Sequence, residues 1–183
     1  MSELDLAGKR IAVLVEQQYQ ELEVWYPVYR LREAGADVTL VAPEAGKTYA
    51  SKLGYPAKSE LSAADVSVDD FDAVVIPGGF APDYLRRSSF VLDFVRDMAD
   101  QGKVVAAICH GPWVLCSTPA LKGRRATSFF AIKDDVHNAG ADWVDEPVVR
   151  DGNIITSRTP DDLPVFLRTI IEAVAELAPV EAR

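Results

Sequence analysis

Short apolar runs alternate with longer amphipathic stretches along most of the chain, and this alternation restricts the possible folds more than any other feature. Ile11–Val15 and Val104–Ile108 are continuous runs of β-branched and small apolar residues, typical of strands buried on both faces. Val38–Ala42 and Phe71–Ile76 are further runs of this kind. Strands that alternate with helices imply an α/β fold, in which a mostly parallel sheet carries helices on both faces.

The stretches between and after these strands have the apolar spacing of helices. Helices are expected over 21–34, over 83–101, from Trp113 to about Leu121, and over 161–177. The apolar residues expected on one side of the first helix are Leu22, Tyr26, Tyr29 and Leu31. Gly35 fits the cap that ends this helix, and Phe90 is among the residues of the second helix expected to face inward.

The remaining segments predict hairpins within a single domain. Residues 47–61 are rich in Gly, Pro, Ser and Lys, which indicates a surface excursion or a hairpin. Asp151-Gly152, inside residues 143–157, is a strong hairpin-turn pattern. Because no repeat, low-complexity tract or linker interrupts the chain, one domain is expected over residues 1–183.

The charge balance argues against nucleic-acid and membrane partners. The chain has 183 residues and a net charge of −9, from 28 acidic and 19 basic side chains. Stable binding to nucleic acid or to an anionic membrane is therefore disfavoured, and no apolar run approaches the ~18 residues that span a bilayer. With two cysteines and no export signal, the sequence predicts a reduced, cytoplasmic protein.

The residues around Cys109 have the spacing of a nucleophile elbow. In Ala107-Ile108-Cys109-His110-Gly111, small residues stand two positions before and two positions after the cysteine. The turn from strand to helix is so tight that larger side chains there would collide with the neighbouring backbone. Pro112 follows near the first helical position, where its missing N–H costs nothing. The alternative is that Cys109 is only a small buried hydrophobe, as free cysteines usually are.

A cysteine at a helix start would lie against unpaired N–H groups and the positive end of the helix dipole. These groups stabilise the thiolate, so a pKa below the usual ~8.5 is expected for Cys109. The N–H of His110, directly after the nucleophile, is placed to bind an oxyanion. Gly78 and Gly79, after another predicted strand, can bring further N–H groups close because they carry no side chain.

His110 and Glu23 are the titratable partners expected beside the thiol. His110 can act as a general base, since the turn separates successive side chains; otherwise it is a helix-start residue bonded to a carbonyl or carboxylate. Glu23 would share a proton with the sulfur and be protonated, unless it is only a favourable charge at a helix N-terminus. His137 is expected at the surface, and Cys116 in the core.

These motifs resemble the PfpI family of intracellular peptidases and protein deglycases, within the larger Parkinsonism-associated deglycase superfamily. The similarity runs from Arg10 to about Leu177. Its most specific segments are 71–73 with 77–79, 102–103, 108–112, 132–135, 138–140 and 157–164. The resemblance implies a flavodoxin-like three-layer sandwich, related to the class I glutamine amidotransferase domain, with Cys109 as the nucleophile and His110 beside it.

The resemblance also implies an acid donated by a neighbouring subunit, which falls on Asp83. The protein would then be a homo-oligomer, either a dimer or a hexamer. Peptidase-like members often have Glu at the position of Asp83, members often carry an acid where this chain has Gln20, and the archaeal peptidases have Tyr where Phe129 stands. The departures at Gln20 and Phe129 favour a reactive thiol over proteolysis.

The leading functional hypothesis is a cysteine-dependent stress enzyme that acts on small reactive carbonyls or on glycated protein adducts. It would need no cofactor and no metal, because the two histidines and two cysteines do not have zinc-site spacing. An intracellular cysteine peptidase is the alternative from the same site. A redox sensor or holdase chaperone, in which Cys109 is oxidised without turnover, is the third. A glutamine amidotransferase is rejected, since it needs a distant His-x-Glu pair and His137 precedes Asn138-Ala139.

Overall fold

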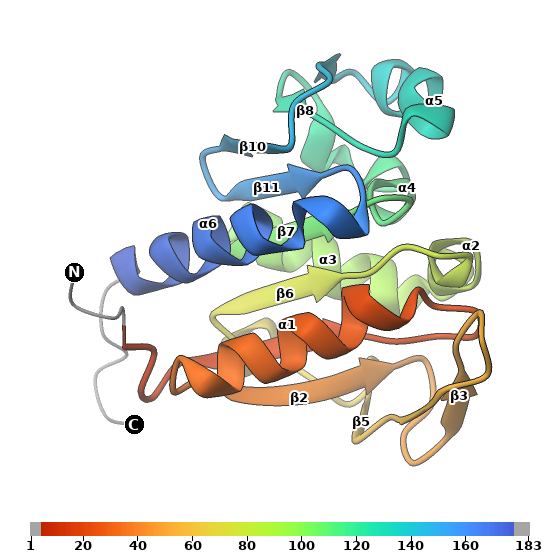
Figure 1. The fold of residues 1–183 in the computed structure, drawn as a ribbon, viewed down its shortest axis with the longest axis vertical. Helices are drawn as coiled ribbons and strands as arrows, with labels where there is room; N and C mark the ends of the chain where they lie inside the picture. Colours follow the sequence, from red (N-terminus) through yellow and green to blue (C-terminus); the bar gives the residue numbers. More distant parts are fainter. Residues whose placement is uncertain (1–4, 178–183) are drawn as a thin grey trace.

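A seven-stranded sheet forms the middle layer of the structure, a computed structural model that describes residues 5–177 (Figure 1). Its strands, in spatial order, are β10 (Val148–Asp151), β11 (Ile154–Ser157), β7 (Val104–Ile108), β6 (Ala73–Ile76), β1 (Arg10–Leu14), β2 (Asp37–Ala42) and β5 (Leu61–Ser62). All neighbours are parallel except β10 and β11. The mostly parallel sheet predicted from the apolar runs is therefore confirmed.

Helices cover both faces of this sheet. α1 (Glu21–Glu33) and α6 (Leu163–Glu176) lie side by side on the face nearer the viewer in Figure 1, and α3 (Ser89–Asp100) lies behind the sheet. The other elements are α2 (Ala81–Leu85), α4 (Pro112–Cys116), α5 (Lys133–Asn138), the hairpin β3 (Thr48–Ala50) and β4 (Pro56–Lys58), and the pair β8 (Arg125–Ala126) and β9 (Asp142–Trp143). The three-layer arrangement is that of a flavodoxin-like fold.

The buried face of α1 differs from the one that the apolar spacing indicates. Leu22, Tyr26 and Tyr29 are 55%, 38% and 61% exposed, and Leu31 is the only one of the four predicted residues inside the core. The residues that α1 buries are Glu23, Val24, Pro27, Val28 and Leu31. The buried face therefore includes a proline and a carboxyl group, and large aromatic residues lie on the outer face.

Two predicted helices are shorter than the sequence pattern suggests. The stretch 83–101 is divided into α2 and α3, because Ser88 caps α3 by accepting a hydrogen bond from the N–H of Val91. Phe90, in the first turn of α3, is 56% exposed rather than buried. The helix expected from Trp113 to Leu121 ends at Cys116 as α4, and a 3₁₀ turn follows it over Pro119–Leu121.

The predicted hairpins and caps agree with the structure. β10 and β11 are antiparallel and enclose Asp151-Gly152, with Gly152 at φ 61°. β3 and β4 form the hairpin expected within 47–61. Beyond it, β5 joins the edge of the main sheet, a strand that the sequence pattern does not reveal. Gly35 follows α1 with φ 95°, which fits the predicted helix end.

Three adjacent central strands end at the same edge of the sheet. β7 leads into Cys109, β6 leads into Pro77-Gly78-Gly79, and β1 leads into residues 15–20 before α1 begins. In open parallel sheets, ligands bind outside this carboxyl edge, so the fold brings the three predicted strand ends together. Among the described residues, no helix is long and apolar enough to cross a membrane.

The elbow spacing predicts a measurable cost for a side chain at Gly111. Its φ of −49° is open to alanine, but an added Cβ would lie 2.5 Å from the carbonyl oxygen of Ile76 and 2.8 Å from that of Ile108. Gly111→Ala should therefore lower the free energy of unfolding by about 1–3 kcal/mol, measured by urea denaturation. An unchanged unfolding midpoint would contradict the close approach of these chains.

Candidate active site

Cys109 lies at the turn from β7 to α4 with its backbone in the left-handed region, at φ 62°. A residue other than glycine in this region is uncommon, and strain of this kind clusters at functional sites. The turn is held from both sides, because the Cys109 N–H donates to the carbonyl of Ser157 (3.0 Å) and the Cys109 carbonyl accepts from the N–H of Phe129 (2.9 Å). The side chain is 9% exposed.

Glu23, Gly78 and Gln20 form a closed ring of hydrogen bonds next to this turn. The Gly78 N–H donates to Glu23 Oε2 (2.7 Å), the Glu23 N–H donates to Gln20 Oε1 (3.0 Å), and the Gln20 N–H donates to the Gly78 carbonyl (3.3 Å). Gln20 is also the N-cap of α1, since its side chain accepts from the N–H of Leu22 (2.7 Å). The ring fixes the carboxyl group of Glu23 relative to the end of β6.

Gly78 lies between Glu23 and Cys109. A Cβ added to Gly78 would be 2.6 Å from Glu23 Oε2 and 2.8 Å from Cys109 Cβ, so any side chain there would separate the acid from the thiol. Glu23 is fully buried, and burial raises its pKa to about 8. Its Oε1 atom has no hydrogen-bond partner among residues 5–177. The direction of the pKa shift agrees with the prediction that Glu23 is protonated.

The pKa of Cys109 differs from the sequence-based prediction. Burial of the sulfur, followed by the charge of Glu23, raises the pKa of the Cys109 thiol to about 12. The N–H groups of His110 and Gly79 oppose this shift, but α4 has only five residues and therefore offers a small dipole. The prediction of a lowered pKa at the helix start is wrong, because desolvation outweighs the helix end at this position.

His110 is held beside the sulfur in its neutral form. Cys109 Sγ and His110 Nδ1 are 3.3 Å apart. The imidazole stacks on Phe129, with ring centroids 5.0 Å apart, and meets the edge of Trp113. Burial, and then the charge of Lys52, lower the pKa of His110. A neutral imidazole at this distance can accept a proton from the thiol.

Gly79 and His110 provide the backbone N–H groups that approach the sulfur. Gly79 has φ 73°, a conformation that glycine adopts readily, and it pairs with Tyr19 in an antiparallel bridge. Gly78, also expected to bind an oxyanion, does not offer its N–H, because this group already donates to Glu23. The role of Gly78 in this structure is to let the acid and the thiol approach each other.

The other residues singled out in the sequence lie outside this cluster. Asp83 is half-buried in α2 and forms an ion pair with Arg87 of its own chain. His137 is exposed, as expected, and Cys116 is half-buried against the core. Within residues 5–177, no group of three or more His, Cys, Asp and Glu side chains is arranged to hold a metal ion.

Lys52 is the site residue that the sequence did not reveal. It belongs to the turn of a hairpin distant in sequence, and its charge acts on Glu23 and His110 only because the chain folds back. The sequence marks Gln20 as a departure from the acid that family members often carry, but not as the N-cap of α1, because glutamine is not a usual N-cap.

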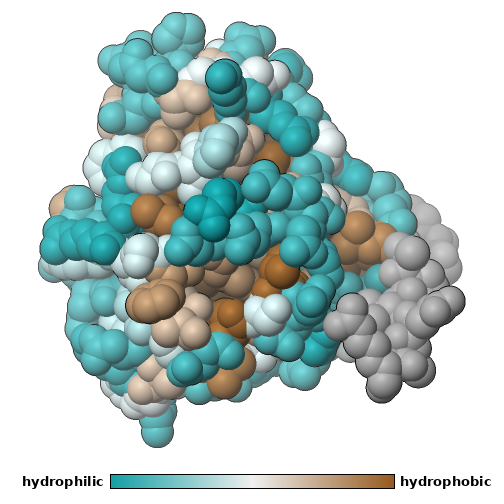
Figure 2. Space-filling view, turned by 180° about the vertical axis from the view of Figure 1, so that it is seen from behind, coloured by the Kyte–Doolittle hydropathy of each residue, from teal (hydrophilic) through white to brown (hydrophobic). Residues whose placement is uncertain are grey.

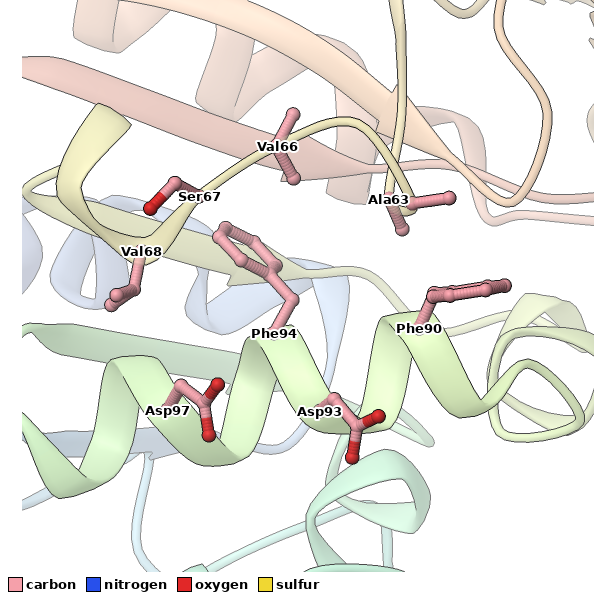
Figure 3. A pocket seen from close by; sticks show the side chains of 9 residues that line it. Ala63, Val66, Ser67, Val68, Phe90, Asp93, Phe94 and Asp97 are labelled. Atoms are coloured by element: carbon pink, nitrogen blue, oxygen red, sulfur yellow. The ribbon is translucent and has the colours of Figure 1, made fainter.

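Two surface cavities lie away from Cys109. One, of about 380 Å³, is lined by Tyr26, Tyr29, Arg30 and Glu33. Another, of about 310 Å³, runs between α3 and the segment 63–68 (Figure 3). α3 belongs to the face seen in Figure 2, where hydrophobic patches lie among hydrophilic side chains. Neither cavity is lined by a residue of the thiol cluster.

Residues 9–173 match the DJ-1/PfpI family, and the chain belongs to that family. Deglycase PfpI of Pyrococcus furiosus is 41% identical over 163 residues, covering 89% of this chain and 98% of the relative. The putative cysteine protease YraA of Bacillus subtilis is 46% identical over 161 residues, covering 88% and 95%. Both the family and the fold predicted from the motifs are confirmed.

The similarity extends to solved structures. The crystal structure of Drosophila melanogaster DJ-1beta has a TM-score of 0.85 and 33% identity to this chain, and the match covers 91% of this chain and 90% of that chain. The names of the relatives support an enzyme of the deglycase or cysteine protease kind.

The raised pKa of Glu23 predicts a pH-dependent stability difference. The pKa of Glu23 is 4.5 in the unfolded chain and about 8 in the folded chain. At a pH between these two values, the unfolded chain has released a proton that the folded chain keeps, so this group makes folding less favourable as the pH rises. Glu23→Gln has no such proton. Its free energy of unfolding relative to the wild type should therefore increase from pH 5 to pH 8, by at most about 1.4 kcal/mol per pH unit.

Urea denaturation at several pH values measures this difference. Glu33→Gln, at the exposed end of α1, is the matched control and should follow the wild type. Parallel profiles for Glu23→Gln and the wild type would mean that the buried carboxyl group titrates normally.

Proposed function

We propose that the protein is a cysteine-dependent enzyme that acts on small reactive carbonyl compounds or on their adducts with proteins. The observation that carries this proposal is the cluster at the carboxyl edge of the sheet. There, the thiol of Cys109 lies 3.3 Å from the imidazole of His110, under the N–H groups of Gly79 and His110. The name of the Pyrococcus furiosus relative supports the same reaction class.

The proposed reaction begins with a neutral thiol. Sγ forms a bond to the aldehyde carbon of methylglyoxal while its proton passes to Nδ1 of His110. The carbonyl oxygen becomes an alkoxide that the N–H groups of Gly79 and His110 stabilise, and it then takes the proton from His110. The product of this first step is a hemithioacetal, and His110 is neutral again.

Glu23 would carry protons in the steps that follow. A proton moves from the former aldehyde carbon to the neighbouring carbonyl carbon, and the hydroxyl proton of the hemithioacetal moves to the oxygen of that carbonyl. The product is a thioester of lactate, and water then releases lactate and the free thiol. A group that exchanges a proton near neutral pH suits such a transfer, and the pKa of about 8 for Glu23 lies in that range. On an aminocarbinol, the adduct of methylglyoxal with an amine, Sγ would form a bond to the carbon that bears the amine while the C–N bond breaks, and the thiol proton would pass through His110 to the leaving amine.

An intracellular cysteine peptidase is the second candidate, supported by the name of the Bacillus subtilis relative. The small exposure of Cys109, 9%, favours a small carbonyl over an extended polypeptide, because a peptide bond would need room for residues on both sides. Oxidation of Cys109 without turnover is the remaining non-enzymatic possibility. A cytoplasmic location stays a prediction.

The proposed reaction requires the thiol of Cys109. Purified protein should form lactate from methylglyoxal, and Cys109→Ala should abolish this activity, because the bond to the substrate cannot form. Cys116→Ala is the control, since Cys116 packs against the core and should not affect the chemistry. Lactate is measured with an enzymatic end-point assay. Equal lactate formation by Cys109→Ala and the wild type would rule out the proposed nucleophile.

We further propose that the active unit is a homo-oligomer in which Asp83 of one subunit acts on His110 of the neighbouring subunit. α2 holds Asp83 next to Phe80, which is 43% exposed, and exposed aromatic residues are enriched at interfaces. Two-fold interfaces are the commonest in homo-oligomers, so each subunit would complete the site of the other. The alternative is that Asp83 only pairs with Arg87 in its own chain, the contact present in this structure.

A subunit-mixing experiment separates the two roles of Asp83. Cys109→Ala and Asp83→Ala proteins should each be inactive, and exchange of their subunits should restore part of the activity, because a mixed dimer has one intact Cys109 facing one intact Asp83. Subunit exchange is followed with mass tags. If the Asp83→Ala protein is inactive and its subunits exchange with those of Cys109→Ala, but no activity is recovered, Asp83 acts only within its own chain.

A further inference from the structure

The turn of the β3–β4 hairpin is fastened to the start of α1 by several short hydrogen bonds. Glu21 Oε1 accepts from Ser51 Oγ (2.5 Å) and from the N–H of Leu53 (2.6 Å). Between these two residues, the N–H of Lys52 donates to the carbonyl of Tyr19 (3.0 Å). Exposed hairpin turns are usually mobile, so this number of bonds holds the backbone of Lys52 in an unusually defined place.

The same segment connects the hairpin to the thiol site. Tyr19 pairs with Ser51 on one side and with Gly79 on the other, and Gly79 directs its N–H at the sulfur of Cys109. Lys52 therefore directly follows Ser51, the first of three bridged residues, Ser51, Tyr19 and Gly79, that lead to the sulfur of Cys109. In Figure 1 the β3 hairpin lies beside the carboxyl edge of the sheet, next to the start of α1.

The charge of Lys52 acts on both titratable partners of the thiol. It lowers the pKa of Glu23 and that of His110. The side chain is exposed and takes part in none of the ion pairs of the described residues. Glu21, an acid that also feels the charge of Lys52, uses one carboxylate oxygen to bind the hairpin, and its effect on the pKa of Glu23 is smaller than that of Lys52.

We propose that Lys52 is a specificity-determining residue that gives the thiol site a preference for substrates with a negative charge close to the reacting carbon. A chain with a net charge of −9 repels such substrates in general, and the positive charge of Lys52, carried on a turn whose backbone is fastened beside Tyr19, opposes this repulsion locally. As a preference among carbonyl substrates, this inference rests on the proposed function. The effect of the charge of Lys52 on reagents that attack Cys109 can be tested without any catalytic turnover.

Alkylation of Cys109 by iodoacetate and by iodoacetamide provides that test, because the two reagents differ by one charge. The ratio of their rate constants, iodoacetate over iodoacetamide, should fall roughly two- to fivefold in Lys52→Gln, the range expected for an exposed charge pair. Lys52→Arg should keep the wild-type ratio. Lys58→Gln is the matched control, since Lys58 is an exposed lysine of β4 at the other end of the hairpin.

Labelling is followed by mass spectrometry of the Cys109 peptide, in the Cys116→Ala background. The difference between the wild type and Lys52→Gln should shrink in about 1 M salt, because exposed charges are screened. An unchanged ratio in Lys52→Gln, or an equal fall in Lys58→Gln, would overturn the proposal. The catalytic activity of the protein does not enter this result.

The substrate preference is then measured with a matched pair of adducts. The methylglyoxal hemithioacetals of N-acetylcysteine and of N-acetylcysteine amide share the reacting carbon and differ by one carboxylate. The N-acetylcysteine adduct, which carries the carboxylate, should have the higher kcat/KM because its KM is lower. Lys52→Gln should reduce this advantage in kcat/KM about two- to fivefold. Turnover of both adducts with equal kcat/KM would refute the preference while leaving the proposed function standing. Absence of turnover would refute the proposed function, and the alkylation ratio would still decide the role of Lys52.

Discussion

The left-handed backbone of Cys109 is the constraint on which the rest of the site depends. At φ 62° the chain reverses from β7 into α4 within one residue, and such a conformation costs about 1–3 kcal/mol for a residue other than glycine. The compensation comes from the hydrogen bonds of Cys109 to Ser157, at the end of β11, and to Phe129. Gly111 allows the turn to approach the carbonyl of Ile76. The thiol is thus positioned by backbone contacts, which no side-chain rearrangement can easily change.

The second constraint is the buried carboxyl group of Glu23. A fully buried acid is costly unless it is neutral or fully bonded, and one of its oxygens has no partner among the described residues. The ring through Gln20 and Gly78 keeps the group there. The cap that binds the N–H of Glu23 is an amide, so it adds no negative charge beside a protonated carboxyl group. An acid at the position of Gln20 could make the same bonds but would repel any charge on Glu23.

The sequence predicts the strands and the thiol more accurately than the helices and the electrostatics. The strands β1, β6 and β7 are continuous apolar runs, and the elbow is a local pattern in which Cys109 and Gly111 stand at fixed spacing. The faces of α1 could not be predicted in the same way, because Leu22, Tyr26 and Tyr29 mark an apolar side that the fold leaves exposed. The contribution of Lys52 depends on the approach of distant segments, which a local pattern does not contain.

The same reasoning explains why the pKa of Cys109 could not be predicted from its place at a helix start. The dipole of a helix is a local property that the sequence suggests, whereas burial of the sulfur and the approach of Glu23 are properties of the whole fold. Desolvation and the neighbouring acid raise the pKa of the thiol, which disfavours the thiolate. A base beside the sulfur then assists the attack, and His110, whose pKa is lowered by burial, lies 3.3 Å from Sγ.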